Sequence, residues 1–343
     1  MPSSPAPLTL LCMPAPAPNI PTLAPGDRVQ SDFLVMERAE KKMASGDPYV
    51  ILTLGNASGR IETAPLWPDK LPWADGADRG TVVQAIGDIS LYGRNGSFKR
   101  QLTITAPLRV LPKDQFDMAA FLPGVGDCTK LWDWIDKQRE EMKSATLRNV
   151  VDLFFADDDF RLRFERTPGS PSGHHAKLGG LLLHVYEVVS IAKTTARTAR
   201  ANMDLIIAGS LLHDIGKVEA YEVSATGFSV TPCGLLLGHV VLGALMLERV
   251  LAKLNHPVCT DGQLLELQHM ILSHHGSLEF GSPVQPATLE AEIVHWADES
   301  SAKANDMSES LEDPDAFQDG SEISDRKPWR VGRRIWRRPH QWE

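Results

Sequence analysis

The stretch Leu211-Leu212-His213-Asp214-Ile215-Gly216-Lys217 places a histidine, a carboxylate and a lysine directly behind an apolar run. The run, residues 204–212, has the length and composition of a helix, and Gly216 is typical of a helix end. Adjacent side chains diverge by about 100° on a helix. His213 and Asp214 therefore reach one ion most easily at the helix end, and we expect a metal site rather than a solvated pair.

Further segments around this stretch have apolar residues at helical spacing and predict an all-α domain. They are residues 131–155, 178–198, 235–254, 263–275 and 289–305. Most of the chain's 11 histidines lie between His174 and His295, several of them beside small or apolar residues. Independent core histidines would not gather in this way, so we expect a shared site inside the helical domain.

Helix bundles build metal sites from side chains of facing helices. Imidazole and carboxylate ligands without a thiolate suit Mn, Fe, Co, Ni or Zn. The candidate metal ligands, each on or at the end of a predicted helix, are His184, His213, Asp214, His239, His274, His275 and Asp298.

The region before the helices has short β-type runs separated by glycine turns, at residues 28–36, 49–54, 59–66, 81–86 and 98–110. Turn signals include Gly46-Asp47-Pro48, Gly55-Asn56 and Asn95-Gly96. This pattern favours a small closed antiparallel barrel, with an OB-fold as the leading interpretation. The expected fold is therefore an N-terminal β-barrel followed by an all-α domain.

The bulk composition fits a two-domain globular protein. The 343 residues exceed what one core usually organises, and the hydrophobic share of 43% is typical of soluble proteins, which excludes a fibre or a membrane span. The net charge of −9 means that nucleic acid is attracted only by a local basic surface or by bound ions. The sequence contains no C-x-x-C pair, so neither a zinc ribbon nor a disulfide framework is indicated. A cytoplasmic location is therefore expected.

The two ends differ in composition from the predicted domains. We interpret residues 1–25 as a disordered Pro/Ala-rich leader, 26–123 as the barrel, 124–305 as the helical domain and 306–343 as an acidic linker followed by an Arg/Trp-rich tail. The tail either packs back on the protein or contacts nucleic acid, with Arg neutralising phosphate and Trp stacking on bases.

His184, His213-Asp214 and Asp298 together resemble the H…HD…D signature of the HD-domain phosphohydrolases, and residues 213–217 resemble the H-D-x-G-K segment of that superfamily. The additional histidines resemble the expanded ligand set of HD proteins that hold two metals. The resemblance implies one ion on His184, His213, Asp214 and Asp298, and a second on His239, His274 and His275, with Asp214 bridging.

A barrel followed by these motifs resembles, more narrowly, the YhaM-type 3′→5′ exoribonucleases. The motifs are His174-His175-Ala176, Gly179-Gly180-Leu181, His184, His213-Asp214-Ile215-Gly216-Lys217, Gly238-His239, Ser273-His274-His275-Gly276, Gly281-Ser282-Pro283 and Glu290-Ala291-Glu292. The likeness covers residues 26–305 and continues weakly to Arg338. It implies Mn-dependent removal of nucleoside monophosphates from the 3′ end of single-stranded RNA, and sometimes of DNA.

The expected mechanism assigns catalytic roles to Asp214 and Lys217. Two divalent ions about 3.5–4 Å apart generate a hydroxide and neutralise phosphate charge, while Lys217 offers its ammonium to a phosphate oxygen. Candidate strand-binding residues on the barrel are Trp67, Tyr92, Arg94, Phe98, Lys99 and Arg100, with barrel core or a solvated edge as the alternative for each. His174 and His175 could line the substrate mouth.

Two other functions compete with a nuclease acting on single-stranded nucleic acid. HD phosphodiesterases of cyclic dinucleotides follow the paired histidines with G-Y-P, whereas Gly281-Ser282-Pro283 lacks the tyrosine. A catalytically idle binding protein is disfavoured because every proposed ligand is present. No membrane partner is expected, and the protein could be a homo-oligomer.

Overall fold

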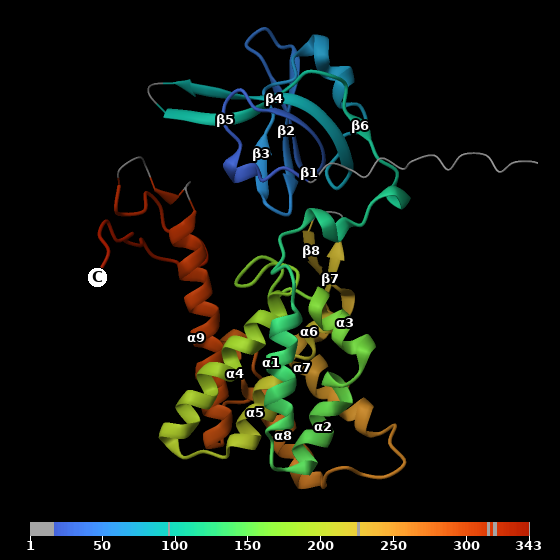
Figure 1. Ribbon diagram of the computed structural model, residues 1–343, viewed down its shortest axis with the longest axis vertical. Coiled ribbons are helices and arrows are strands. Elements are labelled where there is room, and N and C mark those ends of the chain that lie inside the picture. Colours follow the sequence, from blue (N-terminus) through green and yellow to red (C-terminus); the bar gives the residue numbers. More distant parts are fainter. Residues whose placement is uncertain (1–16, 95–96, 225–226, 314–315, 318–320, 343) are drawn as a thin grey trace, which may run out of the picture. The chain divides into compact units, whose positions relative to one another are not determined.

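The computed structural model describes residues 17–94, 97–224, 227–313, 316–317 and 321–342, with the side chains of Arg94, Ser97 and Phe98 left out (Figure 1). The chain divides into two compact units, Met1–Leu122 and Pro123–Glu343. The division lies within a residue of the expected domain boundary.

The first unit is a nearly closed antiparallel barrel. Its strands are β1 (Arg28–Lys42), β2 (Pro48–Asn56), β3 (Gly59–Glu62), β4 (Val82–Arg94), β5 (Ser97–Ile104) and β6 (Arg109–Val110). They pair in the order β3-β2-β1-β4-β5, and β6 pairs with β4. The sheet closes where the Ala64 amide donates to the Leu102 carbonyl at 2.9 Å, just past the end of β3. The prediction of an OB-type barrel is confirmed.

Alternating side chains of these strands fill the barrel, with Phe33, Leu52 and Leu102 fully buried. The strands β1 and β4 are longer than predicted. β1 has a register shift between Val35 and Glu37, so it bends and pairs with β4 before the shift and mainly with β2 after it. The predicted strand at 98–110 is two strands, because Pro107 cannot donate to a ladder and interrupts it. The 3₁₀ turns of this unit are η1 (Ile20–Thr22), η2 (Pro68–Ala74), η3 (Lys113–Gln115) and η4 (Met118–Phe121).

The segment ahead of β1 belongs to the barrel. Ile20 is buried in the barrel core, and Arg100 donates from Nη1 to the carbonyls of Pro21 and Leu23 at 2.8 and 2.6 Å. The sequence predicts a leader up to residue 25, but the barrel core already includes Ile20. Residues 1–16 of that expected leader lie outside the described residues.

The second unit is helical, as expected. Its helices are α1 (Thr129–Glu140), α2 (Ala145–Phe155), α3 (Asp158–Arg166), α4 (Gly180–Ala199), α5 (Met203–Leu212), α6 (Lys217–Ala220), α7 (Pro232–Leu251), α8 (Asp261–Ser273) and α9 (Leu289–Glu312), with a 3₁₀ turn η5 (Leu278–Phe280). The helix predicted at 131–155 is divided because Ser144 caps α2, accepting from the Leu147 amide. A small hairpin, β7 (Tyr221–Ser224) and β8 (Gly227–Val230), was not predicted.

The helix α4 occupies the middle of this unit and packs against α5 and α9. Its inward face, which includes Leu181, Val185, Val188 and Ala192, is fully buried. The apolar spacing of this segment, residues i, i+4, i+7 and i+11, explains why it is a core helix. Side chains between these apolar positions, such as His184, are therefore carried into the interior.

The helix α7 is interrupted at Gly238, whose φ of 72° and ψ of 153° are not helical. By length and composition alone this helix could cross a membrane. In the structure, 33% of its most apolar stretch is buried. The same helix places His239 among the other histidines of the bundle. We therefore treat α7 as part of the helical unit.

Residues 306–312, expected in a linker, are the last turns of α9. Beyond α9 the chain folds back on it: Ala316, Phe317 and Ile335 are buried together beside Met307 and Leu311. Of the two alternatives for the tail, packing on the protein is therefore observed for part of it, at the C-terminal end of α9 (Figure 1).

Candidate metal centre

The predicted ligands come from the ends of two helices, from a break within a third and from the interiors of two more. His213 and Asp214 follow α5, His239 follows the break in α7, and His274 and His275 follow α8. His184 and Asp298 lie within α4 and α9. His213 and His274 are the C-cap residues of their helices and keep helical backbone angles, with φ and ψ of −54° and −37° and of −63° and −23°, so Asp214 and His275 are the first residues beyond each helix.

The first group of ligands is His184, His213, Asp214 and Asp298, all buried. His184 Nε2 lies 3.0 Å from Asp298 Oδ1 and 3.3 Å from Asp214 Oδ2. His213 Nε2 lies 3.2 Å from the same Asp214 oxygen. Two imidazoles and two carboxylates thus converge in a space that excludes bulk water.

The second group is His239, His274 and His275. His239 Nε2 and His274 Nε2 lie 3.4 and 3.6 Å from Asp214 Oδ1. The two oxygens of Asp214 therefore face different groups, Oδ2 the first and Oδ1 the second. This is the arrangement that a bridging carboxylate requires.

Hydrogen bonds of the outer ring nitrogens determine which nitrogen points inward. The Nδ1 atoms of His213, His274 and His275 lie 2.6–2.7 Å from the carbonyls of Ser210, Ile271 and Phe280. A carbonyl only accepts, so each Nδ1 carries the hydrogen and each Nε2 presents a lone pair. His239 and His275 bring their Nε2 atoms within 3.3 Å of each other. With the hydrogen of His239 on Nδ1 as well, both Nε2 lone pairs would be available to one cation.

A hydrogen-bonded chain behind His184 was missed by the sequence reasoning. His184 Nδ1 lies 2.9 Å from Ser301 Oγ, and this hydroxyl donates to Glu187 Oε2 at 2.7 Å. Because the serine hydrogen is used on the glutamate, His184 Nδ1 is the donor to Ser301 and its Nε2 is free for the centre. Glu187 follows His184 by three residues and Ser301 follows Asp298 by three, so helical spacing could have identified both.

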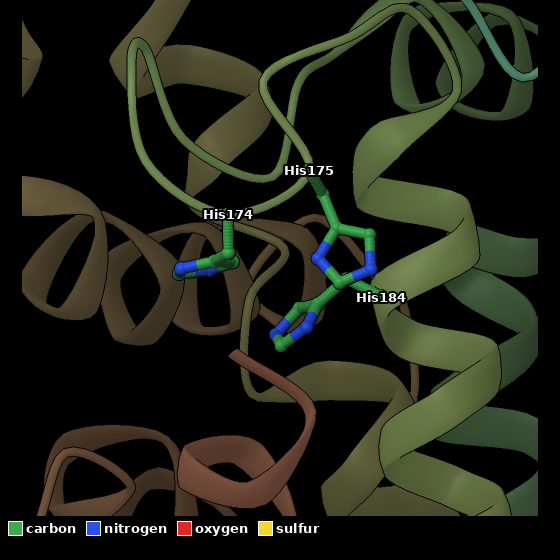
Figure 2. Close-up of side chains that lie close together, drawn as sticks. All are labelled: His174, His175 and His184. Atoms are coloured by element: carbon green, nitrogen blue, oxygen red, sulfur yellow. The ribbon is translucent and has the colours of Figure 1, made fainter. Parts of the chain in front are cut away.

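The paired histidines of the loop before α4 lie close to His184 (Figure 2). The rings of His174 and His175 have centroids 5.2 and 5.4 Å from that of His184. His175 is completely buried, and its Nε2 lies 3.2 Å from Glu187 Oε2. Its burial does not favour direct contact with a substrate. His174 is partly exposed and its Nε2 has no hydrogen-bond partner among the described residues.

Burial and close charges put Asp214, His239 and His274 in the protonation states that bind a cation. Burial would raise the pKa of Asp214, but the Lys217 ammonium and His213 hold it well below its usual range. Burial lowers the pKa of His239 to about 3 and that of His274 well below its usual value. At neutral pH the carboxylate is ionised while these two imidazoles are neutral.

Lys217, at the start of α6, is buried, which excludes the alternative of a surface lysine. Its Nζ lies 2.6 Å from Asp214 Oδ2. Burial opposes its charge, yet Asp214 raises the pKa of the amine. The lysine therefore carries its positive charge beside the shared carboxylate.

Glycine backbone allows the elements to approach closely enough. A Cβ added to Gly216 would lie 2.0 Å from the His239 carbonyl and 2.4 Å from the Gly243 amide. Backbone atoms cannot move away as a flexible side chain can. A side chain at 216 would therefore separate Asp214 from the second group.

The predicted barrel residues do not all have free side chains. Tyr92 is 61% exposed and Trp67 is 44% exposed, packed on Tyr49. Lys99, which pairs with Tyr92 across β4 and β5, forms an ion pair with Glu62 at 3.0 Å. Arg100 holds the segment ahead of β1, a structural role that the sequence did not indicate. The side chains of Arg94 and Phe98 lie outside the described residues.

The donor set fits a divalent transition metal. Asp214 Oδ1 and His274 Nε2 are fully buried without a hydrogen-bond partner in the described part of the chain, a costly state unless a cation satisfies them. Imidazole nitrogens with carboxylate oxygens match Mn, Fe, Co, Ni and Zn chemistry.

Comparisons with known proteins agree with this geometry. The HD domain family matches residues 181–303, the span that contains all seven predicted ligands. The 3′-5′ exoribonuclease YhaM of Bacillus subtilis (strain 168) is 32% identical over 84% of this chain and 88% of its own length. The proteins of the same name from Bacillus pumilus (strain SAFR-032) and Listeria innocua are 31% and 32% identical, over 86% and 83% of this chain and 91% and 88% of their own.

The HD match also implies that the chain binds divalent metal, in agreement with the donor set. The similarity extends through both units, and the resemblance noted from the motifs is confirmed. The chain belongs to the YhaM family of HD-domain proteins.

Proposed function

We propose that this protein is a metal-dependent exoribonuclease that removes nucleoside monophosphates from the 3′ end of single-stranded RNA. The observation that carries the proposal is the position of Asp214, whose two oxygens face two separate groups of ligands. The polarity and the RNA substrate come from the relatives, which bear the name 3′-5′ exoribonuclease.

The ligand groups assign two ion positions. His184, His213, Asp214 and Asp298 would hold one ion, and His239, His274 and His275 the other, with Asp214 shared. Neither position includes a cysteine, so a hard or borderline ion is favoured over a soft one, and Mn is our first choice.

Two divalent ions in these positions would activate water near neutral pH and neutralise charge on the attacking and leaving oxygens. Asp214 would set their separation. Lys217 has its Nζ beside Asp214 and would donate to a non-bridging oxygen of the scissile phosphate. His174 has a buried, unpartnered Nε2 next to His184 and would line the site beside the terminal nucleotide.

We assign the barrel to binding of the single strand. Tyr92 offers an exposed ring for base stacking, and Trp67 a partly exposed one. Lys99 would contribute to phosphate binding only by leaving Glu62, because the two already form an ion pair. A reducing cytoplasm suits the proposal, since Cys128, Cys233 and Cys259 are free thiols; Cys12 lies outside the described residues.

The test is to incubate Mn-loaded protein with RNA labelled at the 3′ end or at the 5′ end, with single-stranded DNA and with cyclic di-GMP. We expect labelled mononucleotide at once from the 3′ label and a descending ladder from the 5′ label. The Asp214→Asn variant serves as the control for contaminating nuclease. Hydrolysis of cyclic di-GMP without degradation of RNA would contradict the proposal.

A further inference from the structure

The segment Arg326–Trp342, called the Arg/Trp segment below, is strongly basic within an acidic protein. It contains six Arg and one Lys but no Asp or Glu, while the whole chain has a net charge of −9. Trp329, Trp336 and Trp342 are 69%, 51% and 77% exposed. Exposed aromatic side chains that lie close together can mark a binding surface, and nothing in the metal centre uses these tryptophans.

The Arg/Trp segment packs against α9. Ile335 is buried with Phe317 against α9, and Arg330 forms an ion pair with Glu309. Arg334 Nε donates to the Ser324 carbonyl at 2.8 Å, and Trp336 pairs with Ile323 as a bridge. These contacts fix the backbone and leave other side chains of the segment facing solvent.

Its anchor is shared with the loop beside the metal centre. Glu309, the partner of Arg330, also lies 3.6 Å from Lys177, two residues after His175. Asn305, one turn earlier on α9, accepts the His175 amide at 2.9 Å. At about 1.5 Å per residue, Glu309 lies about 16 Å along α9 from Asp298. The segment thus lies within reach of a strand of several nucleotides whose end is at the ligands.

The side chains of the Arg/Trp segment that do not hold it on α9 have the chemistry needed to bind single-stranded RNA. Arg333 and Arg338 are exposed, and no ion pair is recorded for either in the described part of the chain. The rings of Trp336, His340 and Trp342 form a row, with centroid separations of 6.2 and 5.3 Å. Arginine neutralises phosphate and an aromatic row stacks bases in any sequence.

We propose that the Arg/Trp segment binds single-stranded RNA several nucleotides away from the end that enters the metal centre. The inference rests on the proposed function for which end of the RNA enters the metal centre. The binding of RNA to the Arg/Trp segment does not depend on that function. This would be a second RNA-binding site, on the helical unit, in addition to the one assigned to the barrel. An acidic peptide or an anionic lipid surface would be attracted by the same charge, but neither requires a row of aromatic rings.

The test compares full-length variants in binding and in hydrolysis. Arg333→Ala/Arg338→Ala removes two exposed cations, and Arg197→Ala/Lys253→Ala removes two exposed cations away from the segment as a matched control. Trp342→Ala removes a stacking ring, and Trp342→Phe retains one. Affinity for a 20-nucleotide RNA with phosphorothioate linkages, which resist hydrolysis, is measured as a function of salt.

We expect the double Arg variant to reduce the salt slope by about 1.4, at about 0.7 per phosphate on a single strand. Trp342→Ala should weaken binding by about 5- to 100-fold, and Trp342→Phe should recover most of the loss. For hydrolysis, KM should rise for the 20-mer and stay unchanged for a trinucleotide, because the short RNA does not reach the segment.

Unchanged RNA affinity and salt slope in the double Arg variant and in Trp342→Ala would overturn the inference. Binding of the same proteins to anionic vesicles and to polyglutamate is measured in parallel. Variants that lose binding to either of these while their RNA binding is unchanged would also overturn it. Equal losses in the Arg197→Ala/Lys253→Ala control would also overturn it. A wild type that binds the 20-mer through this segment but hydrolyses no RNA would instead contradict the proposed function, so the two failures are distinguishable.

Discussion

The two ligand groups that share Asp214 are built differently. The first is almost enclosed, with His184 and His213 inaccessible to solvent and the Asp298 side chain 11% exposed. The second is more open, because His239 and His275 are each partly exposed. The comparison teaches that Asp214 joins a buried group to a more accessible one, and under the proposed function a substrate phosphate would approach from the side of the second group.

The difference follows from the elements that carry the ligands. His184 and Asp298 project from the interiors of long helices and are supported by Ser301 and Glu187. The second group sits next to backbone breaks, with φ of 72° at Gly238 and 79° at Gly276. Helix interiors resist displacement, whereas turns at positive φ depend on glycine and yield more readily.

The largest effect should come from removing the charge that joins the groups. Asp214→Asn keeps the shape but supplies only one acceptor oxygen, and it leaves Lys217 buried without its partner. We expect hydrolysis to fall by about a thousandfold or more while RNA affinity changes little, measured by single-turnover cleavage and by anisotropy. Retained activity in Asp214→Asn would contradict the proposal that both groups act through one carboxylate. Combined loss of binding and activity in a folded variant would place strand affinity in the centre itself.

The second group can be impaired by itself. His275→Ala removes one of its imidazoles, whose hydrogen-bond contacts in the described residues are with His239 and Phe280 and not with the first group. We expect calorimetric titration with Mn to retain one tight site and to lose the other, with activity falling by about a hundredfold or more. His256→Ala, a change of an exposed histidine, is the matched control. Loss of both sites would show that the groups do not form independently.

The first group should respond to its outer support. Ser301→Ala breaks the link between His184 Nδ1 and Glu187, so the ring loses its fixed tautomer and orientation. The tight site should weaken by about 10- to 100-fold, while the affinity of the second stays the same. Ser190→Ala on α4 also loses a serine hydroxyl, one bonded to a backbone carbonyl, and should leave both sites intact. Equal weakening of both sites would deny the separation of the groups.

The smallest effect concerns the metal-free protein and pH. Burial lowers the pKa of His239 to about 3 in the folded state, so between that value and the ordinary histidine pKa the unfolded chain binds more protons. Stability is then present above about pH 6.5 and is lost as the pH falls. The melting temperature of chelator-treated protein should therefore drop by a few degrees from pH 7 to pH 5, and His239→Gln should flatten the slope. A rise in melting temperature on acidification would contradict this sign.

Much of the site was predictable because its ligands lie in short motifs. His213 and Asp214 were identified as neighbours at a helix end, and the structure places them there. The same holds for His274 and His275 behind α8. The break in α7 at Gly238, the hairpin β7–β8 and the extension of α9 to Glu312 were not predicted. The last turns of α9 pack against Ala316, Phe317 and Ile335, contacts that local periodicity does not reveal.

The sequence by itself determined the order of the elements, the barrel followed by helices, and the residue types able to bind metal, because apolar spacing and ligand chemistry are local properties. Only the tertiary structure decided which oxygen of Asp214 faces which group and which nitrogen of each histidine points inward. It also revealed that Arg100 holds the segment ahead of β1 and that Glu187 and Ser301 support His184. These assignments depend on distances between residues up to 117 positions apart, and such distances exist only once the helices have packed.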